Sequence, residues 1–460
     1  MALTTSETED AARDLLRMRG AERPRLEQIR TYLTGDPTLT WLPQGVPQEV
    51  RALAAISRVN IVKLVADSTV QSMYVDGYTS AAADKRIWEI WQRNRMDRKQ
   101  IGVHRAASVY GAGYVTVLPG KPVPVMRPHS PRYLTAAYGD DDDWPVYGLL
   151  HRGGPKWRLF DDQHVHELET SSDDGNRLVH KGKFEHEQDV CPIVRYLATE
   201  DLDDPVVGEI EPLFQLQDQI NITTFLLLVA QHYGAHKQRY ILGWMAKSEE
   251  QKLKVAASTL LTIPRKPGDV EVGEFAATDL SGYIESREAT LRHLAVISQT
   301  PANELLGQLV QLSAEALDAV NASNQRKITE RQTVIGEAHE QALGQAGSLL
   351  GIPVDPFAEI AWKDTERRKL PTVVAALAVL AEKLGVPERE LWQMVPGVSQ
   401  SQTRRWEAAA GHDATPGAGR ETAHGDPGGT DTDTDTAAPD TPPTPAGAPG
   451  RGPRVLENAA

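Results

Sequence analysis

A single long helix, predicted to begin at Ser313, constrains the fold of this chain more than any other feature. Ser313 is a favourable N-cap, and Glu315 lies where a negative charge interacts well with the helix dipole. Helical spacing continues for about thirty residues, up to the glycines at Gly344 and Gly347. At 1.5 Å per residue this helix is a rod of roughly 45 Å, which needs a long surface to pack against.

One face of this helix carries a thin apolar stripe. The residues on that face are Leu317, Val320, Asn324, Ile328, Arg331, Ile335, Ala338 and Ala342. Two are polar and two are small, which is a poor composition for the core of one domain. A neighbouring copy of the chain can supply partners for Asn324 and Arg331. We therefore predict a subunit interface made of Leu317, Val320, Asn324, Ile328, Arg331 and Ile335.

The periodicity elsewhere indicates a mixed α+β chain. Helical spacing is found at 50–65, 82–95, 99–110, 211–234, 280–298, 371–384, 387–394 and 399–410. Period-two patterns separated by turn residues predict a small antiparallel sheet with strands at 114–118, 123–126, 145–151, 156–160 and 164–169. From residue 411 onward the chain is rich in Gly, Pro, Thr, Asp and Ala. That composition predicts a disordered acidic tail over 411–460.

The charge and the residue counts exclude several classes of protein. A formal net charge of −14 argues against a protein that grips nucleic acid over its whole surface. One cysteine, Cys191, excludes an intramolecular disulfide and a thiolate metal cluster, and we expect it to be a small buried residue. The longest apolar run, 225–230, is far shorter than the ~20 residues that cross a bilayer, so we expect no membrane span.

Few residues suggest catalysis. Asp140–Asp143 is a run of four carboxylates in a turn, and such neighbours mostly point apart into solvent. His164 and His166 share one face of a predicted strand, but Glu167 and Glu169 lie on the other face and no third ligand is evident. We expect an exposed strand here, no metal site, no cofactor and no enzyme. A metal-dependent hydrolase or nuclease that uses these acids and histidines remains the alternative from another class.

Four stretches resemble the portal proteins of tailed bacteriophages, in the siphophage group typified by the portal of a Bacillus phage. They are 60–77 (NIVKLVADSTVQSMYVDG), 91–118 (WQRNRMDRKQIGVHRAASVYGAGYVTVL), 211–243 (EPLFQLQDQINITTFLLLVAQHYGAHKQRYILG) and 300–319 (TPANELLGQLVQLSAEALDA). The third is similar to the family's stem-entering helix, with Asp218 and Asn221. The chain departs from the family pattern at Ser313-Ala314, where relatives often have Ser-Gly.

The resemblance implies the portal fold, with its parts in a fixed order along the chain. These parts are a wing (1–208), a stem helix (209–236), a clip (237–278), a second stem helix (279–298), a channel loop (299–312), a long helix (313–350), a helical crown (351–410) and the tail (411–460). A ring of twelve subunits is implied at one capsid vertex, assembled in the host cytoplasm and retained in the virion. Another capsid or head–tail adaptor ring component is the nearer alternative.

The resemblance also implies the partners. Double-stranded DNA would pass through the ring without sequence recognition, the terminase large subunit and later the head-completion proteins would dock at the clip, and the major capsid and scaffolding proteins would surround the ring. The loop 299–312 has Glu304 as its only charge, which suits weak contact with a sliding polyanion. Its predicted DNA-facing residues are Gln299, Asn303, Leu305, Leu306, Gln308 and Gln311.

Overall fold

The computed structural model describes most of the chain up to residue 409. The described residues are 3–39, 41–43, 45–80, 85–139, 144–172, 177–202, 207–234, 239–242, 271–274, 279–307, 314–363, 370–395, 398, 402, 403, 405, 406 and 409. Contacts divide the chain into a unit of residues 1–406 and a second of residues 407–460. The elements below belong to the first unit. The carboxylate run 140–143 and the tail from 411 lie outside the described residues.

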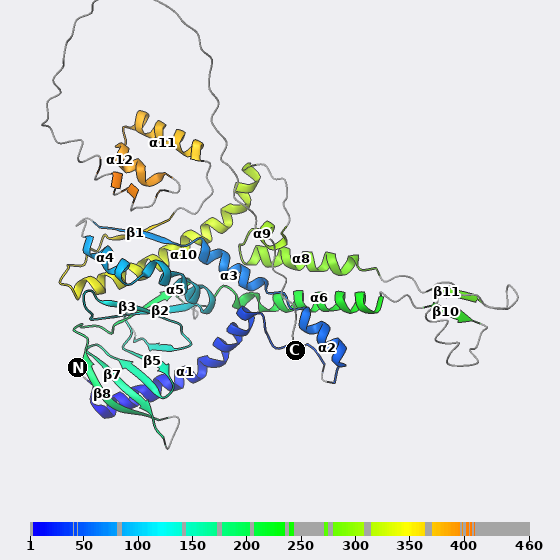
Figure 1. Ribbon diagram of the computed structural model, residues 1–460, viewed down its shortest axis with the longest axis horizontal. Helices are drawn as coiled ribbons and strands as arrows, with labels where there is room; N and C mark the ends of the chain where they lie inside the picture. The colour runs from blue at the N-terminus through cyan, green and yellow to red at the C-terminus, as the bar shows by residue number, and fades with distance from the viewer. Residues whose placement is uncertain are drawn as a thin grey trace, which may run out of the picture. The chain divides into compact units, whose positions relative to one another are not determined.

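The N-terminal helix α1 (Thr5–Thr34) joins two parts of the structure (Figure 1). It begins with a capping box, in which Thr4 and Glu7 exchange side-chain and backbone hydrogen bonds, and it ends at Gly35 with φ of 76°. Its first half buries Ala12 and Leu15 against one sheet, whereas Ile29 and Tyr32 belong to a separate core. Sequence analysis did not identify this helix, because its acidic start resembles a solvated segment.

Two small sheets follow from the period-two segments, where one was expected. The first has the order β3-β2-β9, from β2 (Ala112–Leu118), β3 (Val125–His129) and β9 (Ile193–Leu197). The second is an antiparallel meander of β4 (Leu134–Ala137), β5 (Tyr147–Gly153), β6 (Lys156–Phe160), β7 (His164–Thr170) and β8 (Leu178–Glu185). The second sheet packs α1 on one face, and its other face shares a core with Tyr114 and Ile193 of the first sheet.

The largest core joins the start of the chain to the long helix. Contributing elements are β1 (Val75–Thr79), α4 (Lys85–Arg93), α5 (Met96–Tyr110), α10 (Ala314–Ser348) and β12 (Glu359–Trp362), together with β2, β3 and β9. The helix α3 (Ile61–Gln71) belongs instead to the core that contains Ile29. The strands β1 and β12 pair antiparallel although nearly 300 residues separate them, from Val75↔Trp362 to Thr79↔Glu359. Trp91 and Tyr196 are fully buried beside residues of α10.

A polar chain inside this core fixes the state of two histidines. His104 Nδ1 lies 3.2 Å from the Met73 carbonyl oxygen and must carry a proton to donate to it. His104 Nε2 therefore accepts from His339 Nε2, 2.8 Å away, and His339 Nδ1 accepts from the Tyr196 hydroxyl at 3.0 Å. Every group is satisfied only when both rings are neutral. Burial lowers the pKa of His104 to about 4 and that of His339 well below its usual value.

Two helices of the second half run side by side (Figure 1). They are α6 (Phe214–Gly234), preceded by the short η1 (Glu211–Leu213), and α8 (Ser281–Ile297). Between them in sequence lie β10 (Arg239–Leu242) and β11 (Glu271–Glu274), which form an antiparallel pair. The helix α2 (Gln48–Ile56) also contacts α6.

The remaining helices are short. They are α9 (Ala302–Leu306), α11 (Leu370–Leu384), α12 (Glu388–Leu391) and η2 (Trp392–Met394). The sequence predicted α11 and the α12–η2 segment within one residue at most boundaries, and it predicted α6, α8 and the start of α10 equally well. The end of the long helix, predicted at the glycines 344 and 347 and within 313–350, lies at Ser348. Among the described helices, none is both long and apolar enough to span a lipid bilayer.

Candidate functional site at the junction of α8, α9 and α10

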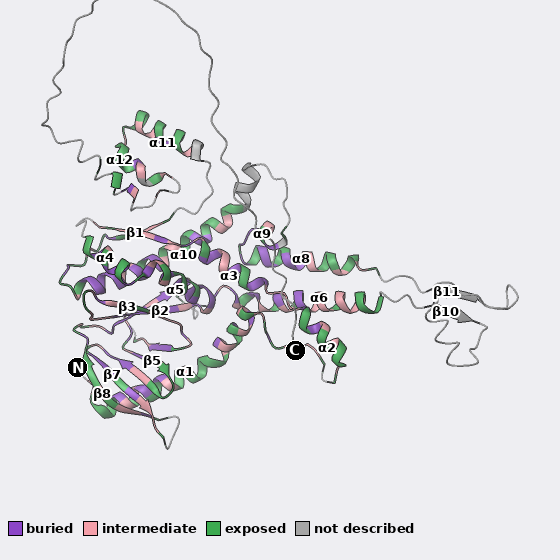
Figure 2. Cartoon of the chain, in the orientation of Figure 1, coloured by how far each residue is buried: buried purple, intermediate pink, exposed green. Residues whose placement is uncertain are grey.

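The stripe on α10 divides into two halves with different surroundings (Figure 2). Ile328, Ile335, Ala338 and Ala342 are all buried in the chain's own core, at 6% exposure or less. Ile328 and Ile335 were predicted to face a neighbouring subunit, because this face of the helix has few large apolar residues. They are instead covered within the chain, since α4, β2, β9 and β12 pack larger side chains against α10. Asn324 is half-buried, and the side chains of Leu317 and Val320 lie outside the described residues.

Arg331 finds its partner within the same chain. Its Nε lies 3.4 Å from Glu209 Oε1, and the Lys327 ammonium lies 3.7 Å from the other oxygen of that carboxylate. The Glu209 and Lys327 side chains are 5% and 7% exposed. Burial lowers the pKa of Lys327, and Glu209 partly offsets this effect. A partner from a neighbouring chain is therefore not needed to neutralise Arg331, which corrects the expectation from sequence.

The carboxylate also contacts α3, and its partner Lys327 contacts the end of α8. The Thr69 hydroxyl of α3 donates to Glu209 Oε2 at 2.8 Å, and Lys327 donates to the carbonyl of Ser298, just after α8, at 3.0 Å. A Cβ on the preceding residue, Gly208, would lie 2.0 Å from the Val109 carbonyl oxygen. Only glycine lets the backbone approach α5 this closely and present Glu209 inward. We call Glu209, Lys327 and Arg331 the junction cluster.

The predicted channel loop begins at Gln299, next to the Ser298 carbonyl that Lys327 contacts, and it contains the short helix α9. Within α9, Leu305 is 7% exposed and packs in a core with residues of α3, α6 and α8, so it does not face a channel as predicted. Glu304 accepts a hydrogen bond from Ser68 at 2.9 Å. Gln299 is exposed with φ of 52°, and Asn303 is half-buried. Leu306 lies in α9 with its side chain outside the described residues, as are Gln308 and Gln311 altogether.

Polar side chains of α6 anchor that helix to the start of α3. Gln217 Oε1 accepts from the backbone N–H groups of Ile61 and Val62 at 3.0 and 3.2 Å, and Asn221 Oδ1 accepts from Val59 N–H at 3.1 Å. These donors have no partner within α3, because a helix leaves its first N–H groups unpaired. The Tyr32 hydroxyl donates to Asp218 at 2.8 Å, and burial raises the pKa of this carboxyl.

The far half of the α6–α8 pair leaves apolar side chains uncovered. Beyond Thr223 no residue of α6 is buried, and before Thr290 no residue of α8 is buried. Leu226, Tyr233 and Ile284 are 43%, 52% and 48% exposed, and Figure 2 shows the green and pink of these helix ends. We call residues 224–234 and 281–289 the open helix pair. Sequence periodicity did not predict this exposure, because the outer part of α6 carries apolar residues on every face of the helix.

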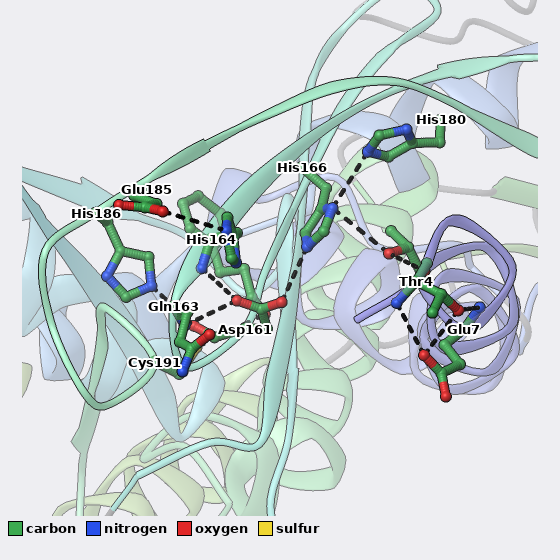
Figure 3. Close-up of polar contacts among 12 residues, drawn as sticks. Thr4, Glu7, Asp161, Gln163, His164, His166, His180, Glu185, His186 and Cys191 are labelled. Carbon is green, nitrogen blue, oxygen red and sulfur yellow. Dashed lines mark hydrogen bonds and ion pairs between the residues drawn. The ribbon is translucent and has the colours of Figure 1, made fainter. Parts of the chain in front are cut away.

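The two histidines of β7 are buried, which contradicts the prediction of an exposed strand. His164 is 8% exposed and His166 is fully buried, and Asp161 from the β6–β7 turn supplies a third group beside them (Figure 3). His166 Nε2 lies 2.9 Å from Asp161 Oδ2. Burial opposes ionisation of Asp161, but hydrogen bonds from His166 and from two backbone N–H groups hold its pKa at about 2. The spacing D-x-x-H-x-H in the sequence could have indicated this group. It was missed because Asp161 lies in the turn before β7, and only residues on the faces of the strand were compared.

Cys191 is a small buried residue, as predicted. The residue is 2% exposed and packs with Phe160 and Ile193 on the sheet face opposite the histidines. Burial raises the pKa of this thiol well above its ordinary value. A thiol in that state is a poor nucleophile and a poor metal ligand.

The chain resembles known proteins along most of its length. A family model described as "Phage portal protein, SPP1 Gp6-like" matches residues 15–415. The portal protein of Mycobacterium phage L5 is 23% identical over 414 residues, covering 80% of this chain and 82% of the relative. That of Mycobacterium phage D29 is 24% identical over 416 residues, covering 80% and 83%.

Two solved structures of gene transfer agent (GTA) particles also align with the chain. One is the virion of a native particle, with a TM-score of 0.44, and the other is the neck of an empty particle computed with C6 symmetry, with a TM-score of 0.42. Both are 15% identical and cover 80% of this chain and 95% of theirs. Because the family model spans residues 15–415, the chain belongs to the SPP1 Gp6-like family of phage portal proteins, which are structural virion components and not enzymes.

Proposed function

We propose that the chain assembles into a ring of twelve subunits that forms the channel for double-stranded DNA at one capsid vertex. The observation that carries this proposal is the open helix pair. A helix that is apolar on all sides is stable in water only where neighbours cover it. The outer part of α6, from Thr224 to Gly234, has no acidic side chain and His232 as its one basic side chain, and α8 covers only part of that surface. Copies of the same pair in adjacent subunits supply the missing cover.

Electron microscopy and light scattering of the purified protein test the ring. The double substitution Leu226→Ser and Ile284→Ser should convert rings to monomers, because it places hydroxyls in the proposed interface. Ile101→Ser is the matched control, since Ile101 is an exposed apolar residue of α5 outside the pair, at 39% exposure. Wild-type monomers, or rings of the double variant as stable as wild type, would contradict the proposal.

We further propose that Gln299, Asn303, Leu306, Gln308 and Gln311 contribute to the channel wall, with Leu305 removed from the predicted set because it is in the core. Uncharged side chains suit a wall past which DNA slides, because each phosphate that a cation neutralises adds affinity and salt dependence. A deletion of 303–308 is a poor test, since it would take Leu305 out of its core.

Substitution to lysine tests the wall more cleanly. Gln308→Lys with Gln311→Lys should leave ring assembly intact and reduce the amount of DNA packaged, with an effect that weakens as salt rises. Gln325→Lys is the control, because Gln325 is an exposed residue of α10 outside the loop. Equal packaging by the loop variant and the control would remove the loop from the channel wall.

We propose that the segment 237–278 is the clip, where the terminase large subunit docks during filling and head-completion proteins bind afterwards. The α6–α8 pair leads into and out of this segment, and the β10–β11 pairing closes its base. The major capsid and scaffolding proteins are proposed to contact the rest of the ring.

The register of β10 and β11 allows a precise test. Leu242 pairs directly with Glu271, so an Asn-Gly turn can replace residues 243–270 and keep the hairpin. We expect this variant to form rings that no longer bind the terminase large subunit in a pull-down. An insertion of the same dipeptide after Asp173, between β7 and β8 in the sequence, is the control. Unchanged terminase binding would place the docking site elsewhere.

A further inference from the structure

A group of buried imidazoles and one carboxylate lies at one end of the five-stranded sheet, on the face that α1 covers. His164 and His166 alternate along β7 and point to the same face, and Asp161 lies in the turn that precedes the strand. His180 on β8 and Thr8 on α1 lie behind His166. Nothing in the proposed channel or subunit contacts uses these groups.

The three nearest groups have the chemistry and the spacing of a metal site. Their potential ligand atoms all lie within 4.8 Å of one another, and the Asp161 and His166 atoms are 2.9 Å apart. Ligand atoms around a tetrahedral zinc ion stand roughly 3.3 Å apart, as bonds of about 2.0 Å require. Two imidazoles with one carboxylate favour a divalent transition metal over Ca²⁺ or Mg²⁺, which prefer all-oxygen sites.

The surrounding hydrogen bonds orient two of the three ligands. Asp161 Oδ1 accepts from the backbone N–H groups of Gln163 and His164, which turns Oδ2 toward His166 (Figure 3). His166 Nδ1 lies 3.2 Å from His180 Nε2 and 3.5 Å from Thr8 Oγ1, so either group can accept a hydrogen bond from Nδ1–H. A ligating histidine usually donates its second N–H to such a partner, which fixes the ring and leaves Nε2 free for the ion.

One atom of the group has no partner in this part of the chain. His164 is 8% exposed, and its Nδ1 is buried without a hydrogen bond among the described residues. Its Nε2 lies 4.0 Å from Glu185 Oε1, beyond hydrogen-bond distance. An ordinary polar network explains the Asp161–His166 contact but leaves His164 unsatisfied. A bound cation satisfies all three residues together.

We propose that Asp161, His164 and His166 bind one Zn²⁺ ion in each subunit. Three protein ligands leave the fourth position to water. The ion joins the β6–β7 turn to β7, and its outer contacts reach β8 and α1 through His180 and Thr8. Its role is structural: it stabilises the sheet on which the N-terminal helix packs.

Zinc titration of the full-length, chelator-treated assembly tests the proposal. Isothermal calorimetry and elemental analysis should give one Zn²⁺ per chain, and Co²⁺ in its place should produce the visible absorption of a tetrahedral site. His164→Gln should lower the zinc affinity at least 100-fold, while the Asp161–His166 hydrogen bond keeps the variant folded. His151→Gln removes a histidine of β5 outside the group and should bind zinc as wild type does.

Thermal unfolding gives a second readout that does not depend on the variants. Zinc should raise the Tm of wild type and of His151→Gln in a concentration-dependent manner, and should leave the Tm of His164→Gln unchanged. Two results would overturn the proposal: no stoichiometric zinc uptake by wild type, or equal zinc affinity of wild type and His164→Gln. The second result would assign the zinc to an adventitious surface site.

Discussion

The C-terminal half of α10 and the open helix pair are both helical and both rich in apolar residues, yet the chain covers them very differently. Ile335, Ala342 and Leu343 of α10 are fully buried among elements from both ends of the sequence. Leu226 and Ile284 of the open helix pair remain 43% and 48% exposed. The first region is a complete core of one subunit. The second is the surface on which we propose that neighbouring subunits pack.

The largest expected difference between the two regions is in the response to a truncated side chain. Ile335→Ala should lower the free energy of unfolding by about 4 kcal/mol, because it leaves a cavity in a packed core. Urea denaturation monitored by tryptophan fluorescence measures this change. A loss of less than about 1 kcal/mol would mean that the α10 core is loosely packed and not complete.

The junction cluster should be nearly as sensitive. Glu209→Gln removes the buried carboxylate that contacts both Lys327 and Arg331 and should cost roughly 3 to 4 kcal/mol of unfolding free energy. Glu330→Gln is a matched control, because Glu330 also contacts Arg331, at 3.3 Å, but is 60% exposed. We expect a change of about 0.5 kcal/mol or less for the control. Equal effects of the two variants would show that the cluster is not desolvated.

Acid should destabilise the core around α10 through the buried pair His104 and His339. The pKa of His104 is about 4 in the folded chain and about 6.5 when unfolded, so between these values the unfolded chain binds more protons. The contribution of His104 to stability is therefore full above pH 6.5 and falls by about 3 kcal/mol as the pH drops to 4. Burial also lowers the pKa of His129 to about 4, so this residue adds to the loss in the same direction. His293→Gln, at an exposed position of α8, should not change this slope. A flat stability profile from pH 7 to pH 4 would contradict the neutral-pair assignment.

The smallest effect on subunit stability is expected in the open helix pair. Leu226→Ser should change the unfolding free energy of the dissociated subunit by about 0.5 kcal/mol or less, since the side chain is already exposed. The same change should weaken ring assembly, as sedimentation at several protein concentrations would reveal. A large loss of subunit stability with intact rings would reverse the comparison, because it would place Leu226 in a core of its own chain.

Family membership decides among the functional hypotheses that the sequence left open. The hydrolase or nuclease hypothesis depended on His164 and His166, and the chain belongs instead to a family of structural portal proteins. The carboxylates 140–143 of that hypothesis lie outside the described residues. The two histidines nevertheless form a potential metal-binding group with Asp161, which the sequence analysis did not predict.

The errors of prediction have a common physical origin. Periodicity identified α5, α6, α8 and α11 because a local pattern decides whether a segment is helical. It failed for the stripe of α10, since Ala338 and Ala342 look too small for a core until Trp91 and Tyr196 are packed against them. It failed for Leu305 because α9 is a short helix whose burial depends on α3, α6 and α8.

The sequence by itself determined most of the longer helices after α1, five strands of the two larger sheets (β2, β3, β5, β6 and β7), the buried thiol and the family, since these depend on local spacing and on ordered motifs. Only the tertiary structure decided which partners the polar residues find. Arg331 pairs with Glu209 across 122 residues, and His339 contacts His104 across 235. The pairing of β1 with β12 is of the same kind. Contacts at such separations follow from the packing of whole elements. The sequence therefore shows that a buried polar residue needs a partner, but it does not show whether that partner comes from the same chain or from a neighbouring one.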